Sequence, residues 1–440
     1  MPTTARDSQL ILGSALIGCL GTFGLHLMLP ALPAIGARFD AGTEATRLLV
    51  SAALLAIALG NLLVGPLSDR FGRRPVILAG LAMFVGGSLA GLAAPTIETL
   101  IAARIVQAFG GGAAMAVVRA MLADHFGAER AATALAYTAT AILVVPMVAP
   151  TLGGLGVEWL GWRAPFAIAA GIGLGIAAFA WAKVRETHAP HGSVATHGAG
   201  AATVDGASSP TAPAADARPR RLGTLASYRQ LLATPEYLVQ VLFGALLTSV
   251  VYLFIAGAPY VAIELYGLAP AEYGLWFVLP AAASFLGFLS SARFGRRQGS
   301  GWMMRTGAAL GLASTTGLVA LVAAGAWTPL ALFVPAMLAC YANALATPSS
   351  TSVAIAVRPD IAGAASGLLG FTQTVLPAAF IQLLAFVENG TPWPLVTSML
   401  AATLLALGCL ARLRRHRPAR NPATSARSRQ DAEREPGDGA

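Results

Sequence analysis

The sequence Arg70-Phe71-Gly72-Arg73-Arg74 recurs, residue for residue, as Arg293-Phe294-Gly295-Arg296-Arg297. Each copy follows an apolar run that is long enough to cross a bilayer, and another such run comes shortly after it. The same string in the same setting in both halves of a chain is typical of an internally duplicated membrane bundle. We therefore expect a membrane protein of two related parts, and such a duplication favours transport as its function.

The composition is that of an integral membrane protein. Of the 440 residues, 56% are hydrophobic and 11% are charged, whereas soluble domains have about 25% charged residues. A helix needs about 20 apolar residues to cross the hydrocarbon core. The chain is therefore expected to be an all-α membrane protein, with twelve transmembrane helices in two pseudo-symmetric six-helix bundles. The predicted spans are residues 9–33, 47–67, 76–95, 99–121, 132–155, 164–183, 237–259, 272–292, 302–324, 327–347, 362–386 and 393–411.

The net charge of +9 does not indicate a nucleic-acid partner. The positive residues lie in short segments between spans and in the C-terminal tail, which is the pattern that orients membrane proteins. This asymmetry predicts that both termini lie in the cytoplasm, with the protein in a bacterial inner membrane. Small molecules, protons and membrane lipid are the expected partners, and we expect a monomer.

A change in composition divides the spans six and six. Residues 187–222 are rich in Ala, Gly, Ser, Thr and Pro and have almost no large apolar side chain, which is typical of a disordered linker. The predicted parts are an N-terminal bundle at 1–186, this linker, a C-terminal bundle at 223–412 and a basic disordered tail at 413–440. Three cysteines lie far apart inside spans, so we expect neither a metal site nor a disulfide.

Two ionisable residues lie deep in the predicted spans: His26 in the first and Arg104 in the fourth. Charge is unfavourable inside a bilayer, so such residues are candidates for function. Gln107 and Gly111 share the helix face of Arg104, and this stripe could meet His26 across a cavity. Two alternatives stay open: Arg104 could reach outward to the interface, and His26 could merely bond a neighbouring carbonyl. No Asp or Glu lies deep in any span, so imidazole is the best candidate for proton coupling.

The segment after the second span is the other informative one: Gly65-Pro66-Leu67-Ser68-Asp69-Arg70-Phe71-Gly72-Arg73-Arg74. Gly65 permits close approach of helices, Gly72 permits a turn, and Asp69 can pair with a cation at a helix end. Anchoring by positive charge on the inner side would explain the arginines. It would not explain the aspartate and glycines together.

This segment closely resembles the signature between helices two and three of the major facilitator superfamily. Arg104–Gly110 resembles the helix-four motif of that superfamily, and Ala149–Gly154 resembles its helix-five antiporter motif, with Ala149 where glycine is usual. Four further segments resemble the Bcr/CflA drug-resistance exporters more specifically: Leu29–Pro33, Arg119–Asp124, Gly161–Arg163 and Gly363–Gly367. The resemblance covers nearly all of the chain except the linker and the tail.

The resemblance implies proton-coupled efflux of drugs or other small organic molecules by alternating access, hence an antiporter that can confer antibiotic resistance. The proton gradient would supply the energy, with no cofactor. Arg104 would couple proton and substrate, and Pro150, Gly153 and Gly154 would shape a bend that limits leak. An inner gate is implied, in which Asp124 pairs with Arg73. Its residues would be Gly65, Asp69, Arg70, Gly72, Arg73, Arg74 and Asp124.

His26 departs from the pattern of these exporters, which tend to have an aspartate three residues before the Leu-Pro of the first span. A base then replaces an acid at the presumed coupling site, which leaves the proton stoichiometry and the preferred substrate charge open. Aromatic residues that could line the substrate cavity are Tyr137, Tyr252, Phe254, Trp276 and Tyr341.

Two other functions remain in view. An importer or facilitator of a metabolite could use the same fold, since a fold does not fix a function. A membrane-embedded enzyme or sensor would need a catalytic constellation or a folded soluble domain, and the sequence shows neither. We therefore expect a transporter and not an enzyme.

Overall fold

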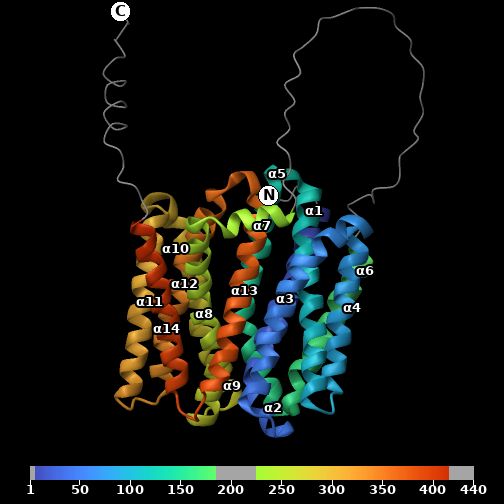
Figure 1. Cartoon of the computed structure of the whole chain (residues 1–440). Coiled ribbons are helices and arrows are strands. Elements are labelled where there is room, and N and C mark those ends of the chain that lie inside the picture. Colours follow the sequence, from blue (N-terminus) through green and yellow to red (C-terminus); the bar gives the residue numbers. More distant parts are fainter. Residues whose placement is uncertain (1–4, 185–223, 416–440) are drawn as a thin grey trace, which may run out of the picture.

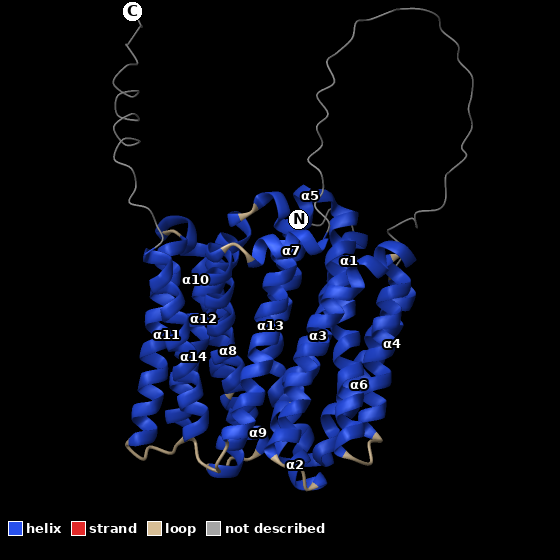
Figure 2. Ribbon diagram, in the orientation of Figure 1, coloured by secondary structure: helices blue, strands red, loops and turns tan. Residues whose placement is uncertain are grey.

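A computed structural model describes residues 5–184 and 224–415. These residues form helices joined by loops, with no strand in the described ranges (Figure 2). The linker predicted at 187–222 and residues 416–440 of the predicted tail lie outside the described residues. The all-helical fold class predicted from the sequence is confirmed.

The helices of the first half are α1 (Ala5–Leu27), η1 (Leu29–Ala31), α2 (Leu32–Phe39), α3 (Thr43–Phe71), α4 (Arg73–Leu92), α5 (Ile97–Leu160), η2 (Gly161–Arg163) and α6 (Ala164–Lys183). Those of the second half are α7 (Thr224–Leu232), α8 (Pro235–Pro259), η3 (Tyr260–Leu265), α9 (Pro270–Trp276), α10 (Val278–Gln298), α11 (Ser300–Ala323), α12 (Pro329–Val357), η4 (Pro359–Ile361), α13 (Ala362–Val387) and α14 (Trp393–Arg415). In each half the long helices pack on one another. The halves meet where α3 packs on α13 and where α5 packs on α9 and α10.

The first arm of α5 runs antiparallel to α1. Gly24 of α1 lies beside Arg104, and Gly21, which precedes it, lies beside Gly111. Residue numbers therefore increase along α5 in the direction in which they decrease along α1. A straight helix of 64 residues would be about 96 Å long at 1.5 Å per residue, far more than one bilayer crossing needs.

The second arm of α5 runs parallel to α1. Gly18 of α1 lies beside Thr138, and Leu27 lies beside Gly153. The element called α5 thus reverses direction between its two arms and crosses the bundle twice. Eleven segments of the described residues are long and apolar enough to cross a membrane, and one of them, Tyr137–Lys183, holds both the second arm and α6. The count of crossings is therefore the predicted twelve.

The first span differs from its predicted bounds of 9–33. Helix α1 ends at Leu27, and the helical path then continues through η1 and α2 to Phe39. Pro30 and Pro33 both lie in this stretch and lack a backbone N–H, so a regular ladder of hydrogen bonds cannot pass through them. The result is a broken helix whose first section ends just after His26.

The two arginine-rich strings lie at the same end of the bundle. The first spans the junction of α3 and α4, where Gly72 has a φ of 94°. The second lies in the last turns of α10, and there the chain turns two residues after the string, at Gly299, with a φ of 78°. Helices α3 and α10 both end at the top of Figure 1, on the side that carries the N-terminus. After the orientation predicted from the arginines, we call this end the inner end, and the opposite end, which carries α2 and α9, the outer end.

Candidate substrate and coupling site

A chain of hydrogen bonds joins α5 to α4 in the middle of the first half. The Arg104 guanidinium donates to Oε1 of Gln107, and Nε2 of Gln107 donates to Oγ of Ser88 over 2.7 Å. Oγ of Ser88 donates in turn to the carbonyl of Phe84, also over 2.7 Å. Arg104 is 2% exposed and Gln107 is 1% exposed. The shared face of these two residues is confirmed, and the alternative in which Arg104 reaches outward is wrong because its side chain lies inside the bundle.

Glycines allow the helices around this chain to come into backbone contact. A Cβ atom at Gly87 of α4 would lie only 2.5 Å from the amide nitrogen of Gln107 and 2.7 Å from the carbonyl oxygen of Ala103. A Cβ atom at Gly24 of α1 would lie 3.3 Å from Nη1 of Arg104. Small residues thus bring the guanidinium against the backbone of α1, as is common where membrane helices pack closely.

His26 lies in the last turn of α1 and is buried. Its Nδ1–H donates to the carbonyl of Thr22 over 2.9 Å. The bond to a neighbouring carbonyl is therefore present, and a coupling role for the imidazole stays a prediction. The imidazole also packs edge-on against Phe277 of the other half, with ring centres 6.0 Å apart. Arg104 lies within electrostatic range of His26, although no hydrogen bond joins these two described side chains. His26 thus stands at the boundary of the halves with one tautomer fixed.

An aromatic cluster of the second half faces His26. Two of the predicted cavity residues, Phe254 and Trp276, both pack on Phe333, with ring centres 5.7 Å apart in each case. Phe277 and Tyr273 complete the cluster. Offset and edge-on ring pairs of this kind are the arrangements that aromatic side chains prefer. The sequence analysis did not single out Phe277, Phe333 or Tyr273.

The other predicted cavity residues lie apart from this cluster. Tyr252 is partly buried against the same apolar core. The Tyr341 hydroxyl donates to Oγ of Ser290 over 3.0 Å, within the second half. Tyr137 is 51% exposed. For Tyr137 and Tyr341 the structure gives no contact with His26 or Arg104, and a role in the cavity wall stays a prediction for all five aromatic residues.

The inner end contains the ion pair implied for the arginine-rich segment. Nε of Arg73 lies 2.9 Å from a carboxylate oxygen of Asp124, and Arg73 also donates to Oγ of Ser68. Arg74 donates to the carbonyl of Trp181 over 2.9 Å and lies over its ring, while Arg70 lies over the ring of Phe71. The surroundings of Gly65 and of the Asp69 side chain are outside the described part of the structure, so the place of both residues in an inner gate stays a prediction.

Asp124→Asn is expected to weaken this inner contact, because Arg73 then loses its ion pair with the Asp124 carboxylate. A charge-assisted hydrogen bond contributes about 1.5–3 kcal/mol, so we expect transport to slow by about tenfold or more. Uptake or efflux of a substrate by proteoliposomes measures the effect. Asp360→Asn is a matched control, since Asp360 forms its ion pair with Arg358, two residues away at the same end. Equal transport rates in Asp124→Asn and the parent would mean that the ion pair has no effect on transport.

The helix-five segment packs against both halves. Ala149 and Pro150 are buried. A Cβ atom at Gly153 would collide with the carbonyl of Leu27 in α1, whereas one at Gly154 would collide with the carbonyl of Pro270 in α9 of the other half. Gly154 therefore belongs to the boundary between the halves. Whether this segment limits leak stays a prediction.

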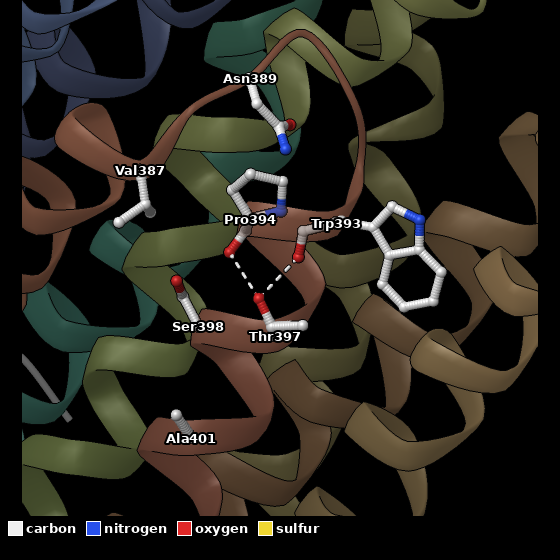
Figure 3. A pocket seen from close by; sticks show the side chains of 7 residues that line it. All are labelled: Val387, Asn389, Trp393, Pro394, Thr397, Ser398 and Ala401. Carbon is white, nitrogen blue, oxygen red and sulfur yellow. Dashed lines mark hydrogen bonds between the residues drawn. The ribbon is translucent and has the colours of Figure 1, made fainter.

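Two of the pockets that described residues line do not include His26, Arg104 or Gln107. One, with a volume of ≈ 430 Å³, lies at the outer end of the second half between the end of α13 and the start of α14 (Figure 3). Its polar atoms are largely engaged, since the Thr397 hydroxyl donates to the carbonyls of Trp393 and Pro394. The other, with a volume of ≈ 380 Å³, lies among α10, α11 and α12. Both pockets lie within one half.

Comparison with known proteins decides the family. The model of the Major Facilitator Superfamily matches residues 14–381 of the chain. The chain belongs to this superfamily. It is thus a transporter of small molecules and a multi-pass membrane protein, and the prediction that it is not an enzyme agrees with the family.

Proteins that are named for drug resistance are similar to this chain over nearly their whole length. A bicyclomycin resistance protein homolog of Haemophilus influenzae is 25% identical, over 90% of this chain and 94% of its own. Multidrug resistance protein D of Escherichia coli is also 25% identical, over 92% and 95%. Among solved structures, a bacterial homolog of the human lysosomal transporter Spinster, in an inward-facing and unoccupied conformation, has a TM-score of 0.68 at 18% identity, over 93% of this chain and 97% of its own. This last likeness shows the fold alone.

Proposed function

We propose that the protein exports small organic molecules in exchange for protons. The observation that carries the proposal is the contact of His26, which lies within electrostatic range of Arg104, with the ring of Phe277 from the opposite half. A transporter that alternates between its two faces needs its binding groups at such a boundary. Imidazole can gain and lose a proton near neutral pH, and aromatic rings offer an apolar surface to organic substrates.

The names of the relatives support export as the direction of transport. Two similar proteins are described as a bicyclomycin resistance protein homolog and a multidrug resistance protein, and resistance by a transporter follows if it removes the compound from the cell. The proposal includes the bacterial inner membrane as location, cytoplasmic termini and a monomeric state. An importer or facilitator of a metabolite is the second candidate, since members of one fold can differ in direction.

Efflux from intact cells tests the proposal. Cells of a pump-deficient strain that express the protein are loaded with a fluorescent dye at two external pH values. We expect lower dye accumulation than in cells without the protein, a stronger effect at the lower pH, and loss of the effect with a protonophore. Higher accumulation of an uncharged nutrient analogue, together with no effect on a panel of dyes and antibiotics, would favour the importer.

His26→Ala is expected to remove proton-driven exchange while the protein still reaches the membrane. His26 is buried at the boundary of the halves, its side chain is of the kind whose ordinary pKa lies closest to neutral, and alanine has no group that could bind a proton in its place. Transport driven by an imposed pH difference in proteoliposomes measures coupling, and His125→Ala is a matched control because His125 is exposed. If His26→Ala retains its pH-driven transport, the coupling proton binds elsewhere.

A further inference from the structure

The polar contacts between the halves gather at the outer end. Oγ of Ser51 in α3 donates to Oε1 of Gln382 in α13 over 3.2 Å, and Oγ1 of Thr151 in α5 donates to the carbonyl of Gly274 in α9 over 3.0 Å. The amide of Ala271 donates to Glu158 over 3.1 Å. These residues lie where α3 begins and where α13 and α5 end, around α2 and α9 at the bottom of Figure 1. The outer end is therefore closed.

Three further contacts at this end involve the ionisable side chains of Arg47, Glu388 and Tyr260. Arg47, in the second turn of α3, is 1% exposed and forms an ion pair with Glu388, the first residue after α13. The ring of Tyr260, where α8 gives way to η3, lies 5.3 Å from Cζ of Arg47. The Tyr260 hydroxyl donates to Oγ1 of Thr46, the neighbour of Arg47. One arginine of the first half is thus held by a carboxylate and a ring of the second.

In this environment, the charge of Arg47 and the charge of Glu388 are each stabilised by the other. Burial raises the pKa of Glu388, and the nearby Glu264 adds to this rise while Arg47 opposes it. Removal of one member of a buried ion pair leaves the other charged and without a partner, which is strongly unfavourable. In an open outer end both side chains would meet water, so this penalty falls on the closed state alone.

The guanidinium of Arg47 also makes fewer hydrogen bonds in this contact than it could. Nε and Nη1 of Arg47 have no hydrogen-bond partner among the described residues, so the guanidinium does not make the two parallel bonds that give arginine–carboxylate pairs their greatest strength. A contact that must break in every transport cycle should have this intermediate strength.

We propose that Arg47, Glu388, Tyr260 and Thr46 form a latch, which holds the outer ends of the two halves together and opens when substrate passes through the outer face. The latch acts on a conformational step and touches no substrate, so these are positioning residues. The latch would serve export or import, with or without coupling to protons. A result that contradicts the latch therefore leaves the proposed function standing, and a result that contradicts proton-coupled export leaves the latch standing.

Labelling of a buried cysteine from the outer side tests the latch without any substrate. Cys19, Cys340 and Cys409 are replaced by alanine, and Ser51→Cys is introduced as the reporter. Ser51 lies one helical turn deeper than Arg47, is 6% exposed, and touches the opposite half. A membrane-impermeant maleimide is added to the outer side of intact cells, and the rate of labelling reports how often the outer end opens.

Glu388→Gln and Arg47→Gln should each raise the labelling rate by at least about tenfold, because the first leaves the buried Arg47 and the second leaves the half-buried Glu388 without its charged partner. Glu44→Gln is the matched control, since Glu44 is an exposed carboxylate in the first turn of the same helix, and it should leave the rate unchanged. The paired variant Arg47→Glu with Glu388→Arg should bring the rate back to within about threefold of the parent by restoring an ion pair.

Tyr260→Phe is a less disruptive variant, which tests the latch if the charge variants do not reach the membrane. It removes only the hydroxyl that donates to Thr46, and a lost neutral hydrogen bond should raise labelling by about two- to tenfold. Unchanged labelling in Glu388→Gln and Arg47→Gln, or in Tyr260→Phe where those are absent, would overturn the proposal. A charge-reversed pair that labels as fast as the single variants would overturn it as well.

Discussion

Gly154→Ala is expected to reduce transport by about ten- to hundredfold in a protein that still folds and inserts. The new methyl group would lie against the carbonyl of Pro270 and the backbone of Ala271 in the opposite half, closer than side-chain atoms ever approach backbone. Overpacking of a close contact is unfavourable by about 1–3 kcal/mol, and each 1.4 kcal/mol shifts an equilibrium about tenfold. The methyl group meets the other half only when the outer end is closed, so it disfavours that state.

Substrate flux in proteoliposomes measures this effect, and Gly171→Ala is its matched control. Gly171 lies in α6, and a Cβ atom there would meet nothing within 4 Å, so the same substitution should leave flux unchanged. The Ser51→Cys reporter should also label faster in Gly154→Ala. Normal flux in Gly154→Ala would mean that the two halves do not approach each other as closely at α5 and α9 as the structure has them.

Arg104→Gln is expected to have the second large effect, a loss of transport of about ten- to hundredfold. Glutamine has no positive charge and cannot span the distance to Gln107 as arginine does, so the chain from Arg104 through Gln107 to Ser88 loses its charged donor. A hydrogen bond to a charged group contributes about 1.5–3 kcal/mol. Arg104→Lys keeps the charge but not the planar fork, and it should recover only part of the activity.

Arg305→Gln is the control for this substitution, because Arg305 lies exposed on α11 and its loss removes the same charge elsewhere. Initial rates at several substrate concentrations separate binding from turnover. If Arg104→Gln transports at the parent rate with an unchanged KM, Arg104 has only a packing role and the proposed site is wrong.

The sequence was sufficient to predict how many times the chain crosses the bundle. Apolar length and the placement of arginines depend on local composition, and the twelve crossings follow from them. The repeated arginine-rich string also predicted two related turns at one end, where α3 and α10 both finish. The break in the first span after Leu27 was not predicted, although Pro30 and Pro33 are in the sequence. Hydropathy alone does not distinguish a straight helix from a broken one.

The site was predicted in part, and the missing part depends on how the halves meet. Arg104 and Gln107 are three residues apart on one helix, so their contact follows from helical spacing. The ring of Phe277 against His26 joins residues on different halves, and no periodicity in the sequence encodes that approach. The contact between Arg47 and Glu388 also joins residues on different halves, and local sequence patterns do not predict it. Only the packing of α3 on α13 reveals them as partners.

The most direct test of the account is a pair of distances between α3 and α13, measured by spin labels at both ends of these two helices. Glu44→Cys with Asn389→Cys reports the outer end, and Phe71→Cys with Ser366→Cys reports the inner end; all four positions are exposed. In the resting protein we expect one short, narrow outer distance. When the latch residue Glu388 is changed to Gln, the outer distance should lengthen while the inner distance shortens. Outer and inner distances that lengthen together, or an outer distance that never changes, would contradict two halves that rock about a central site.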